Sequence, residues 1–328
     1  MNEFELIDLI RNACRQTAPA PVLGIGDDAA VFDLPVGQQA VVCTDTLIAG
    51  RHFPIHTAAA DIGWKALAVN LSDLAAMGAE PRYALLALTL PNADGDWLRQ
   101  FADGFSELAR CHQVALIGGD TSRGALSITV TAVGTVPSGQ AILRSGAGIG
   151  DYIVLTGALG QAAAALGYLL AAEAASAPVD LASAVPPPHW LQALRRPHPQ
   201  VAAGLALRGL ASAAIDISDG LLADLGHVLK QSACGAELVV SEIPGYGELQ
   251  ARLGDRRAQQ CALAGGDDYQ LCATVPTAHW PAVQQVFRDR GLPPLQVIGR
   301  ITAATGISVI DHQCKSLVVA DAGWDHFG

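Results

Sequence analysis

The spacing of hydrophobic and polar residues changes repeatedly along the chain, and each change predicts an element. Apolar residues recur at helical spacing over 3–17, alternate every second residue over 126–136, and cover every face of a helix over 58–78, which predicts that this helix is buried. Val22–Phe32 is typical of a strand that ends in an acidic turn. Further strands are expected at 39–45, 114–120, 152–156, 236–240, 269–275, 295–301 and 306–310, with a short one before Asp216, and further helices at 93–112, 201–210, 255–264 and 278–290, with two more that begin near Leu159 and after Gly220.

Strands and helices mix in both halves of the chain, which predicts two domains that each contain both. The chain has 328 residues, more than one ordinary domain. The glycine-rich stretch 138–150 is the expected boundary, so we expect an N-terminal domain over 1–140 and a C-terminal domain over 150–328. Residues 171–188, rich in Ala, Ser and Pro, are expected to form a solvated insertion.

Composition and charge exclude several classes of protein. With 51% hydrophobic and 16% charged residues the chain is not disordered, and its net charge of −11 offers no basic surface to nucleic acid or an anionic membrane. The seven dispersed cysteines and the acidic early sequence predict a cytoplasmic protein without a signal or transit peptide, and the histidines show no zinc spacing. Glycines interrupt the uncharged stretch 152–172, so a strand, a turn and a buried helix are expected there instead of a membrane span.

Aspartates recur at expected strand ends and glycine turns. Two unit charges about 4 Å apart repel by about 4 kcal/mol at an effective dielectric near 20, and a bound cation removes that cost. For a single pair, ordinary turn chemistry is an equal explanation. The recurrence favours oxygen ligands of Mg²⁺, which bridges carboxylates to substrate phosphates, and hence metal-assisted phosphoryl transfer. The residues concerned are Asp27, Asp28, Asp45, Asp73, Asp120, Asp216 and Asp219.

Asp73 lies in the apolar helix expected over 58–78, three residues after Asn70, so the two share a face. A buried carboxylate must be paired or must coordinate a metal. Both explanations stay open here, because a helix terminus or one basic partner would also satisfy it.

Two common nucleotide-binding patterns would offer an alternative to the metal hypothesis. The phosphate-binding pattern GxxxxGK[ST] is absent from the sequence. Gly24, Gly26 and Ala29 match the looser dinucleotide fingerprint, with Asp45 downstream. That fingerprint requires a long helix, and Pro35 and Gly37 leave room for barely two turns, so it is disfavoured.

The motifs GIGDDAA, CTDTLIAGRHF, KALAVNLSDLAAMGA, LIGGDTSRG, LRSGAGIGD, IDISDGLLADLGH and GGDDYQL, taken in this order, resemble the thiamine-monophosphate kinases, members of the aminoimidazole-ribonucleotide synthetase superfamily. The resemblance covers the whole chain. It implies an α/β fold of the α+β type, with two domains that each pack mixed sheets with helices. It also implies ATP-dependent phosphorylation of thiamine monophosphate with several Mg²⁺ ions, by direct transfer, in a homodimer joined through the N-terminal domains.

The resemblance assigns roles to individual positions. It implies metal ligands at Asp28, Thr44, Asp45, Asp73 and Asp120 in the first domain and at Asp216 and Asp219 in the second, with Asp45, Asp120 and Asp216 the catalytic set. It implies ATP contacts at Gly119, Asp120, Arg144 and Ser218, and thiamine phosphate contacts at His52, Asp267 and Trp324. Judged without the resemblance, surface and packing roles are favoured for His52 and Trp324.

Two positions depart from the family pattern. Cys43 stands where the family usually has serine, so it would contact a metal only through its backbone carbonyl. Asp267 and Gln270 stand where the family has glutamates, and this difference is expected to affect substrate affinity more than the type of reaction. The alternatives are an ATP-dependent synthetase acting on a purine precursor and a non-catalytic metal and nucleotide sensor. Selenophosphate synthetase is disfavoured because Cys14 lies in an expected helix.

Overall fold

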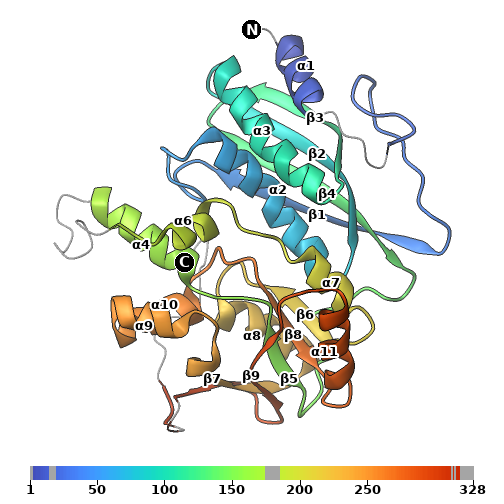
Figure 1. The fold of residues 1–328 in the computed structure, drawn as a ribbon. Coiled ribbons are helices and arrows are strands. Elements are labelled where there is room, and N and C mark those ends of the chain that lie inside the picture. Colours follow the sequence, from blue (N-terminus) through green and yellow to red (C-terminus); the bar gives the residue numbers. More distant parts are fainter. Residues whose placement is uncertain (1–2, 15–19, 174–184, 312, 314, 318–328) are drawn as a thin grey trace. The chain divides into compact units, whose positions relative to one another are not determined.

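The structure is a computed structural model that describes residues 3–14, 20–173, 185–311, 313 and 315–317 (Figure 1). The chain divides into two compact units. The N-terminal unit comprises Met1–Leu74 and Gly78–Ala141, and the C-terminal unit comprises Ala75–Met77 and Ile142–Gly328. Each unit contains a sheet and helices, which confirms the fold class expected from the sequence.

The N-terminal unit is built on a four-stranded mixed sheet in the order β1-β4-β2-β3. Its strands are β1 (Gln38–Ile48), β2 (Glu80–Leu90), β3 (Ala115–Arg123) and β4 (Ser127–Pro137). β4 pairs antiparallel with both β1 and β2, while β2 and β3 are parallel. Along β4, Ile128, Val130 and Ala132 are buried, and Thr129 and Thr131 between them are half-buried.

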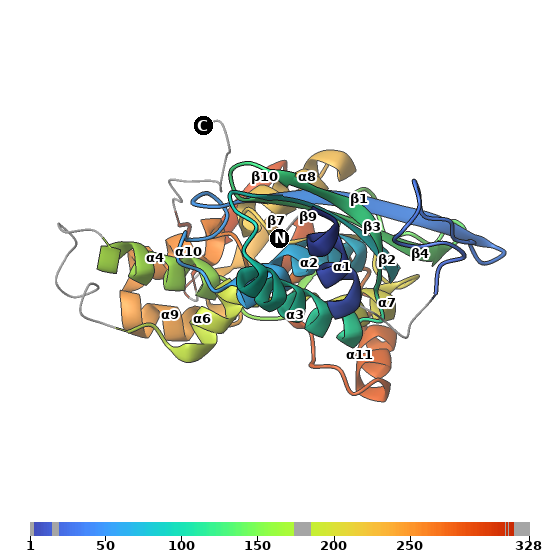
Figure 2. The same cartoon turned by 90° about the horizontal axis from the view of Figure 1, so that it is seen from above.

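Helices cover one face of this sheet (Figure 2). They are α1 (Glu3–Ala13), α2 (Ala59–Ala76) and α3 (Gly95–Cys111). α2 is buried almost throughout, as its uniformly apolar sequence predicts. α2 and α3 approach closely: a Cβ atom at Gly63 would lie 2.0 Å from the Phe101 carbonyl oxygen, and one at Gly104 would lie 1.8 Å from that of Ala60.

The C-terminal unit contains a six-stranded mixed sheet in the order β10-β7-β9-β5-β8-β6. Its strands are β5 (Tyr152–Leu155), β6 (Ala213–Asp216), β7 (Gly235–Val239), β8 (Leu271–Val275), β9 (Gln296–Thr302) and β10 (Gly306–Ile310). β8 runs antiparallel to its neighbours β5 and β6. The C-terminal ends of β5 and β6 therefore lie beside the N-terminal end of β8, at the same end of the strands.

The helices of this unit are α4 (Gln161–Glu173), α6 (Pro188–Arg195), α7 (Val201–Leu207), α8 (Leu221–Ser232), α9 (Tyr246–Leu253), α10 (Asp255–Ala264) and α11 (Trp280–Asp289), with a short 3-10 turn η1 (Val240–Glu242). The main core packs α4, α6, α8, α9 and α10 against one face of the sheet, and Trp190 is its largest fully buried side chain.

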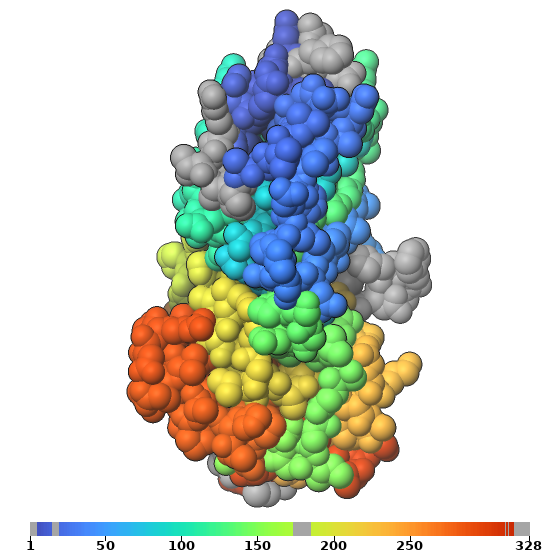
Figure 3. All heavy atoms as spheres, turned by 90° about the vertical axis from the view of Figure 1, so that its right-hand side faces the viewer, coloured from blue at the N-terminus to red at the C-terminus, as the bar shows by residue number. Residues whose placement is uncertain are grey.

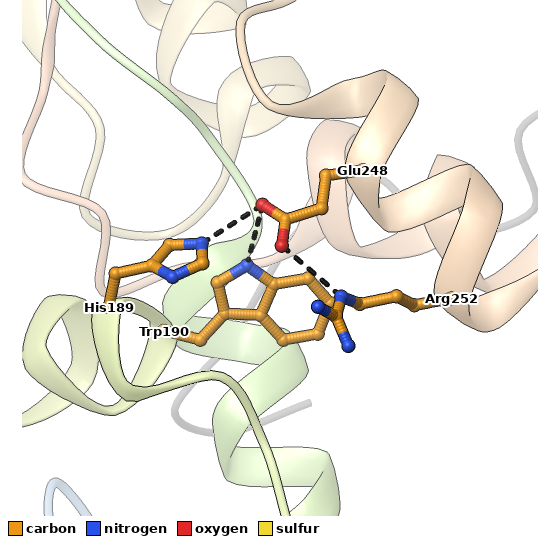
Figure 4. Close-up of polar contacts among 4 residues, drawn as sticks. All are labelled: His189, Trp190, Glu248 and Arg252. Atoms are coloured by element: carbon orange, nitrogen blue, oxygen red, sulfur yellow. Dashed lines mark hydrogen bonds and ion pairs between the residues drawn. The ribbon is translucent and has the colours of Figure 1, made fainter.

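A polar cluster joins α6 to α9 above this tryptophan (Figure 4). Trp190 Nε1 donates to Glu248 Oε2 at 3.4 Å, and His189 Nε2 lies 2.9 Å from the same oxygen. Arg252 Nε donates to Glu248 Oε1 at 3.2 Å, and its guanidinium stands 5.7 Å from the centre of the Trp190 ring. Burial raises the pKa of Glu248, but the hydrogen bond and charge of His189, with the bonds from Trp190 and Arg252, hold it below its ordinary value.

Several elements differ from the sequence prediction. The expected strand at Val22–Phe32 is wrong: the segment forms a loop that is closed by a short antiparallel bridge between Leu23 and Val31. β2, α6 and α9 were not predicted. Residues 171–173 belong to α4 instead of an insertion, and 174–184 lie outside the described residues. Within the described part of the chain no helix is both long and apolar enough to cross a membrane.

Candidate functional site

In the N-terminal unit, β1 and α2 bring together Cys43, Asp45 and Asp73. The Cys43 thiol donates to the Asn70 carbonyl oxygen at 3.3 Å. Burial raises the pKa of this thiol, and the nearby carboxylates of Asp73 and Asp45 raise it further. The two carboxylates therefore flank a neutral thiol on the face of β1 that α2 covers.

The register of the sheet places Thr44 and Asp120 on its other face. Asp45 is opposite Val130, which in turn is opposite Leu86, and both partners are buried on the helical side. Asp120 is opposite Ala87, in the row that continues through Thr129 to Thr46. Directly opposite residues share a face, so Asp45 and Asp120 lie on different faces of the sheet. Gly119, next to Asp120, has a φ of 153°.

Threonines and exposed apolar residues line this second face along β1. Thr44 Oγ1 lies 3.0 Å from Thr131 Oγ1, and Thr46 Oγ1 lies 2.8 Å from Thr129 Oγ1. Val42 and Ile48, which stand on either side of these two threonines on the same face, are 60% and 45% exposed. We call Val42, Thr44, Thr46 and Ile48 the open face of β1.

Asp28 lies in the loop that precedes β1, and its side chain is exposed. Its backbone N–H donates to Asp27 Oδ1 at 2.9 Å, an ordinary turn contact. The loop packs beyond this turn through Phe32, whose ring centre is 4.7 Å from that of Tyr83 in β2. Figure 3 shows the blue atoms of this part of the chain at the surface of the N-terminal unit.

His52 follows β1 and is held by its neighbours. Its ring nitrogen Nδ1 accepts the Ile48 backbone N–H at 3.0 Å, which leaves Nε2 to carry the proton of the neutral ring. The buried Lys65 of α2 donates from Nζ to the His52 carbonyl oxygen at 3.3 Å. The turn that presents His52 is thus fixed from both sides.

In the C-terminal unit, the predicted site segments around Ser218 and Asp267 meet at one edge of the sheet. The Asp267 backbone N–H donates to the Ser218 carbonyl oxygen at 2.8 Å, and the Tyr269 N–H donates to that of Ile217 at 2.8 Å. A Cβ atom at Gly266 would come within 2.3 Å of the Ser218 carbonyl oxygen, so only glycine allows this approach. The loops after β6 and before β8 are therefore bonded backbone to backbone.

Asp216, Asp219 and Asp224 gather at the end of β6 and the start of α8. Asp216 and Asp224 are buried, and Asp219 is half-buried. The pKa of Asp224 is raised to about 7, chiefly by burial and also by the charges of Asp216 and Asp219, while bonds from the Asp219 and Ser218 backbone N–H groups act to lower it. Three carboxyl groups thus influence one another in this loop.

Asp267 and Gln270 have defined partners. Asp267 has a left-handed backbone, with φ 70°, and its Oδ1 accepts the Tyr269 hydroxyl at 3.0 Å. Gln270 Oε1 accepts the Thr156 hydroxyl at 3.0 Å, and the same hydroxyl oxygen accepts the Leu271 N–H at 2.8 Å. The side-chain amide of Gln270 therefore links the loop after β5 to β8 through hydrogen bonds, which is a structural role.

Asp268 closes the start of α4. It is buried, and its Oδ2 accepts the Gly160 N–H at 2.7 Å. Burial raises the pKa of Asp268 well above its ordinary range, while the N–H groups of Gly160 and Ala162 lower it. The N-terminus of α4 is thus already filled by a carboxyl group.

The remaining predicted residues are dispersed. Arg144 is exposed in the loop before β5, and Ser232 of α8 anchors that loop by accepting the Gly146 and Ala147 N–H groups at 3.1 Å. Trp324 lies outside the described residues.

The donor set fits Mg²⁺ by its chemistry. Among the described residues, no three His, Cys, Asp or Glu side chains converge into a closed metal cage. Mg²⁺ does not require one, because it is commonly bound by one or two carboxylates together with waters and substrate phosphates. Asp45 and Asp73 both lie near the Cys43 thiol, and Asp216 and Asp219 both lie near Asp224, so each unit has two carboxylates of the kind that Mg²⁺ takes.

Sequence reasoning did not single out Lys65, Asp224 or Asp268. All three act on backbone atoms: a lysine on a carbonyl, and two carboxylates on N–H groups. The available signal was an ionisable residue in an otherwise apolar run, such as Asp224 in GLLADLGHVL.

Comparison with known proteins places both units in one class. Residues 26–136 match the family of AIR synthase related proteins in its N-terminal domain, and residues 148–312 match its C-terminal domain. The thiamine-monophosphate kinase of Escherichia coli K12 is 41% identical over 325 residues, which cover 99% of this chain and 98% of the relative. The chain belongs to the thiamine-monophosphate kinase family within this class.

Solved structures agree. That of the thiamine-monophosphate kinase from Stenotrophomonas maltophilia K279a matches with a TM-score of 0.82 at 47% identity, covering 94% of this chain and 96% of that one. A structure of AaThiL complexed with AMPPCP and TMP matches with a TM-score of 0.75 at 28% identity, covering 99% and 97%.

Proposed function

We propose that the protein phosphorylates thiamine monophosphate to thiamine diphosphate at the expense of ATP. The observation that carries the proposal is full-length similarity to thiamine-monophosphate kinases, extended by the match to AaThiL complexed with AMPPCP and TMP. The acidic loops support it, because their carboxylates would hold metal ions that neutralise a polyphosphate.

Mg²⁺ would be held by Asp45 and Asp73 in the N-terminal unit and by Asp216 and Asp219 in the C-terminal unit. Asp28, Thr44 and Asp120 are the proposed oxygen donors for a further ion on the other side of the N-terminal sheet. Cys43 would contribute only its backbone carbonyl, because its thiol stays protonated. When bound, the ions would neutralise the charge of the phosphates and polarise the transferred phosphoryl group.

The chain itself binds and orients the two substrates. Arg144 is the proposed fork-shaped donor to ATP phosphate oxygens, aided by the backbone of Gly119 and by Ser218. His52 presents a neutral ring with a proton on Nε2, which suits a hydrogen bond to the phosphate of thiamine monophosphate. Asp267 is the proposed partner of the same substrate, and the backbone bond to Ser218 holds it beside the nucleotide loop. Direct transfer then depends on alignment of the two phosphates.

Two further features of the proposal concern the whole protein. The open face of β1 is the proposed contact in a homodimer, because Val42 and Ile48 expose apolar surface there. We propose a cytoplasmic location, in keeping with free cysteines throughout the described part of the chain.

Phosphorus NMR with ATP, Mg²⁺ and thiamine monophosphate, each omitted in turn, tests the reaction. We expect thiamine diphosphate and ADP to appear together, and only with all three components present. Bound ATP that is not consumed would contradict the proposal and would favour a sensor or a synthetase with another substrate.

A further inference from the structure

Asp224 makes an unusual set of contacts at the start of α8. Its Oδ2 accepts three consecutive backbone N–H groups, those of Ser218 at 3.0 Å, Asp219 at 3.0 Å and Gly220 at 3.1 Å. The residue lies in the first turn of α8 and is 3% exposed. One buried carboxyl oxygen therefore binds all three backbone N–H groups of the turn that carries Ser218 and Asp219.

This arrangement replaces an ordinary helix cap. The residue before α8 is Gly220, which has no side chain to cap the first N–H groups. Asp224 reaches back from within the helix and satisfies the N–H groups of the preceding turn instead. A hydrogen bond from an N–H group to a carboxylate is stronger than one between two neutral groups. Leaving several buried N–H groups without an acceptor would destabilise the fold.

The turn cannot take its shape from Asp224 alone, because the Ser218 carbonyl oxygen is also bonded by the Asp267 N–H. The N–H side of the turn is held by Asp224, and the carbonyl side is held by the loop before β8. With both sides of the backbone fixed, the directions in which the Cα–Cβ bonds of Ser218 and Asp219 point are set before any ligand arrives.

We propose that Asp224 is a positioning residue that fixes Ser218 and Asp219 for metal and nucleotide binding. The inference rests on the proposed function, which assigns the ligand roles to those two residues. In this role Asp224 Oδ2 holds the turn and is not itself a metal ligand, since three N–H groups engage it. Loss of an outer partner that orients a metal ligand typically lowers metal affinity or activity by about 10- to 100-fold.

The test compares Asp224→Ala and Asp224→Asn with Asp289→Asn, which removes an exposed carboxylate of α11. Mn²⁺ binding followed by electron paramagnetic resonance, hydrogen exchange of 217–221, and kcat and KM are measured well below each melting temperature. We expect Asp224→Ala to weaken Mn²⁺ binding and lower kcat by about 10-fold or more, with faster exchange confined to this turn. Asp224→Asn, which keeps an acceptor oxygen, should recover part of both, and Asp289→Asn should match the wild type.

A folded Asp224→Ala variant with wild-type Mn²⁺ binding and kcat would overturn the inference and leave Asp224 a purely structural residue. If that variant does not fold, Asp224→Asn decides, because unchanged Mn²⁺ binding and kcat in it would also overturn the inference. In Mn²⁺ affinity, combining Asp224→Asn with Asp219→Asn should cost little more than Asp219→Asn alone, since Asp224 acts on the metal through Asp219; full additivity in Mn²⁺ affinity would contradict the inference.

Failure of the proposed function has a different signature. Wild-type protein that binds Mn²⁺ but makes no thiamine diphosphate would reject the reaction, while the Mn²⁺ and exchange measurements still decide the role of Asp224. Absence of Mn²⁺ binding to the wild type would overturn the positioning role itself.

Discussion

Asp45 and Cys43 lie on the same face of β1, and the carboxylates of Asp73 and Asp45 both raise the pKa of the buried Cys43 thiol. Carboxylates that lie near one another repel, and a bound cation relieves the repulsion. In the proposed mechanism these residues would let an acidic chain act on an anionic substrate, because they would hold cations.

Replacement of Asp45 tests this residue-scale argument. We expect Asp45→Asn to lower kcat by at least about 100-fold, because the loss of one oxygen ligand removes charge neutralisation from the transferred group, with the fold retained. A coupled ADP assay with circular dichroism measures both. The control is Asp103→Asn, which removes an exposed carboxylate of α3. Full activity in both Asp45→Asn and Asp120→Asn would reject the metal assignment.

The sequence made the ligand candidates visible but not the residues that hold them. Asp45, Asp216 and Asp219 follow apolar runs or precede glycines, and such positions can be recognised locally. Asp224 and Asp268 bond to backbone N–H groups, and Asp268 reaches one more than a hundred residues away. That pairing depends on the folded sheet, which no local pattern encodes.

Among the elements, α2, α10 and β10 were predicted almost to the residue, and α2 was recognisable because its sequence is apolar on every face. β2 was missed because its Ala- and Leu-rich sequence favours helix in isolation, and only its place between β4 and β3 makes it a strand. α9 begins directly after Gly245, which has a φ of 86°, and contains Gly247, so its first residues are typical of a turn in the sequence. Tertiary position decided these elements.

The close approach of α2 and α3 predicts a stability effect. Gly63→Ala places a methyl group against the Phe101 carbonyl and should cost about 1–3 kcal/mol, or more if the helices cannot separate. The matched control, Gly167→Ala at an exposed position of α4, has no atom near the new methyl and should gain about 0.5–1 kcal/mol. Urea denaturation measures both variants. Equal effects would show that α2 and α3 are not in tight contact.

The polar cluster between α6 and α9 predicts a pH dependence. The folded-state pKa of Glu248 lies below its ordinary value of 4.5, so its contribution is present above about pH 4.5 and is lost as the pH falls through the folded-state pKa. Glu248→Gln should therefore lower the free energy of unfolding at pH 6 by about 0.5–1 kcal/mol, a value limited by solvent exposure, and by less at pH 3.5. Urea titrations at both pH values check this. In a His189→Gln background the difference should shrink; an unchanged difference would exclude His189 as the cause.

For the whole molecule, two facts bear on assembly: a net charge of −11 and, in the N-terminal unit, a sheet face that none of that unit's described helices covers. Like charge disfavours association at long range, so a contact between copies needs apolar surface, which Val42 and Ile48 provide.

We expect Thr46→Lys to convert the proposed homodimer into a monomer, since it places a charge in the centre of the open face of β1. Light scattering after gel filtration gives the mass, and circular dichroism reports the fold. The control variant Asp103→Lys, which adds a charge at an exposed position of α3, should remain dimeric. A Thr46→Lys protein that stays dimeric would place the contact elsewhere.

The backbone bond between Ser218 and Asp267 limits how this protein can change over evolutionary time. The N–H and carbonyl that meet there belong to every amino acid except proline at the donor, so many side chains at either position preserve the bond. An inserted or deleted residue in either loop would shift the register and break it. Related proteins should therefore keep the length of both loops even where the residue at position 267 differs.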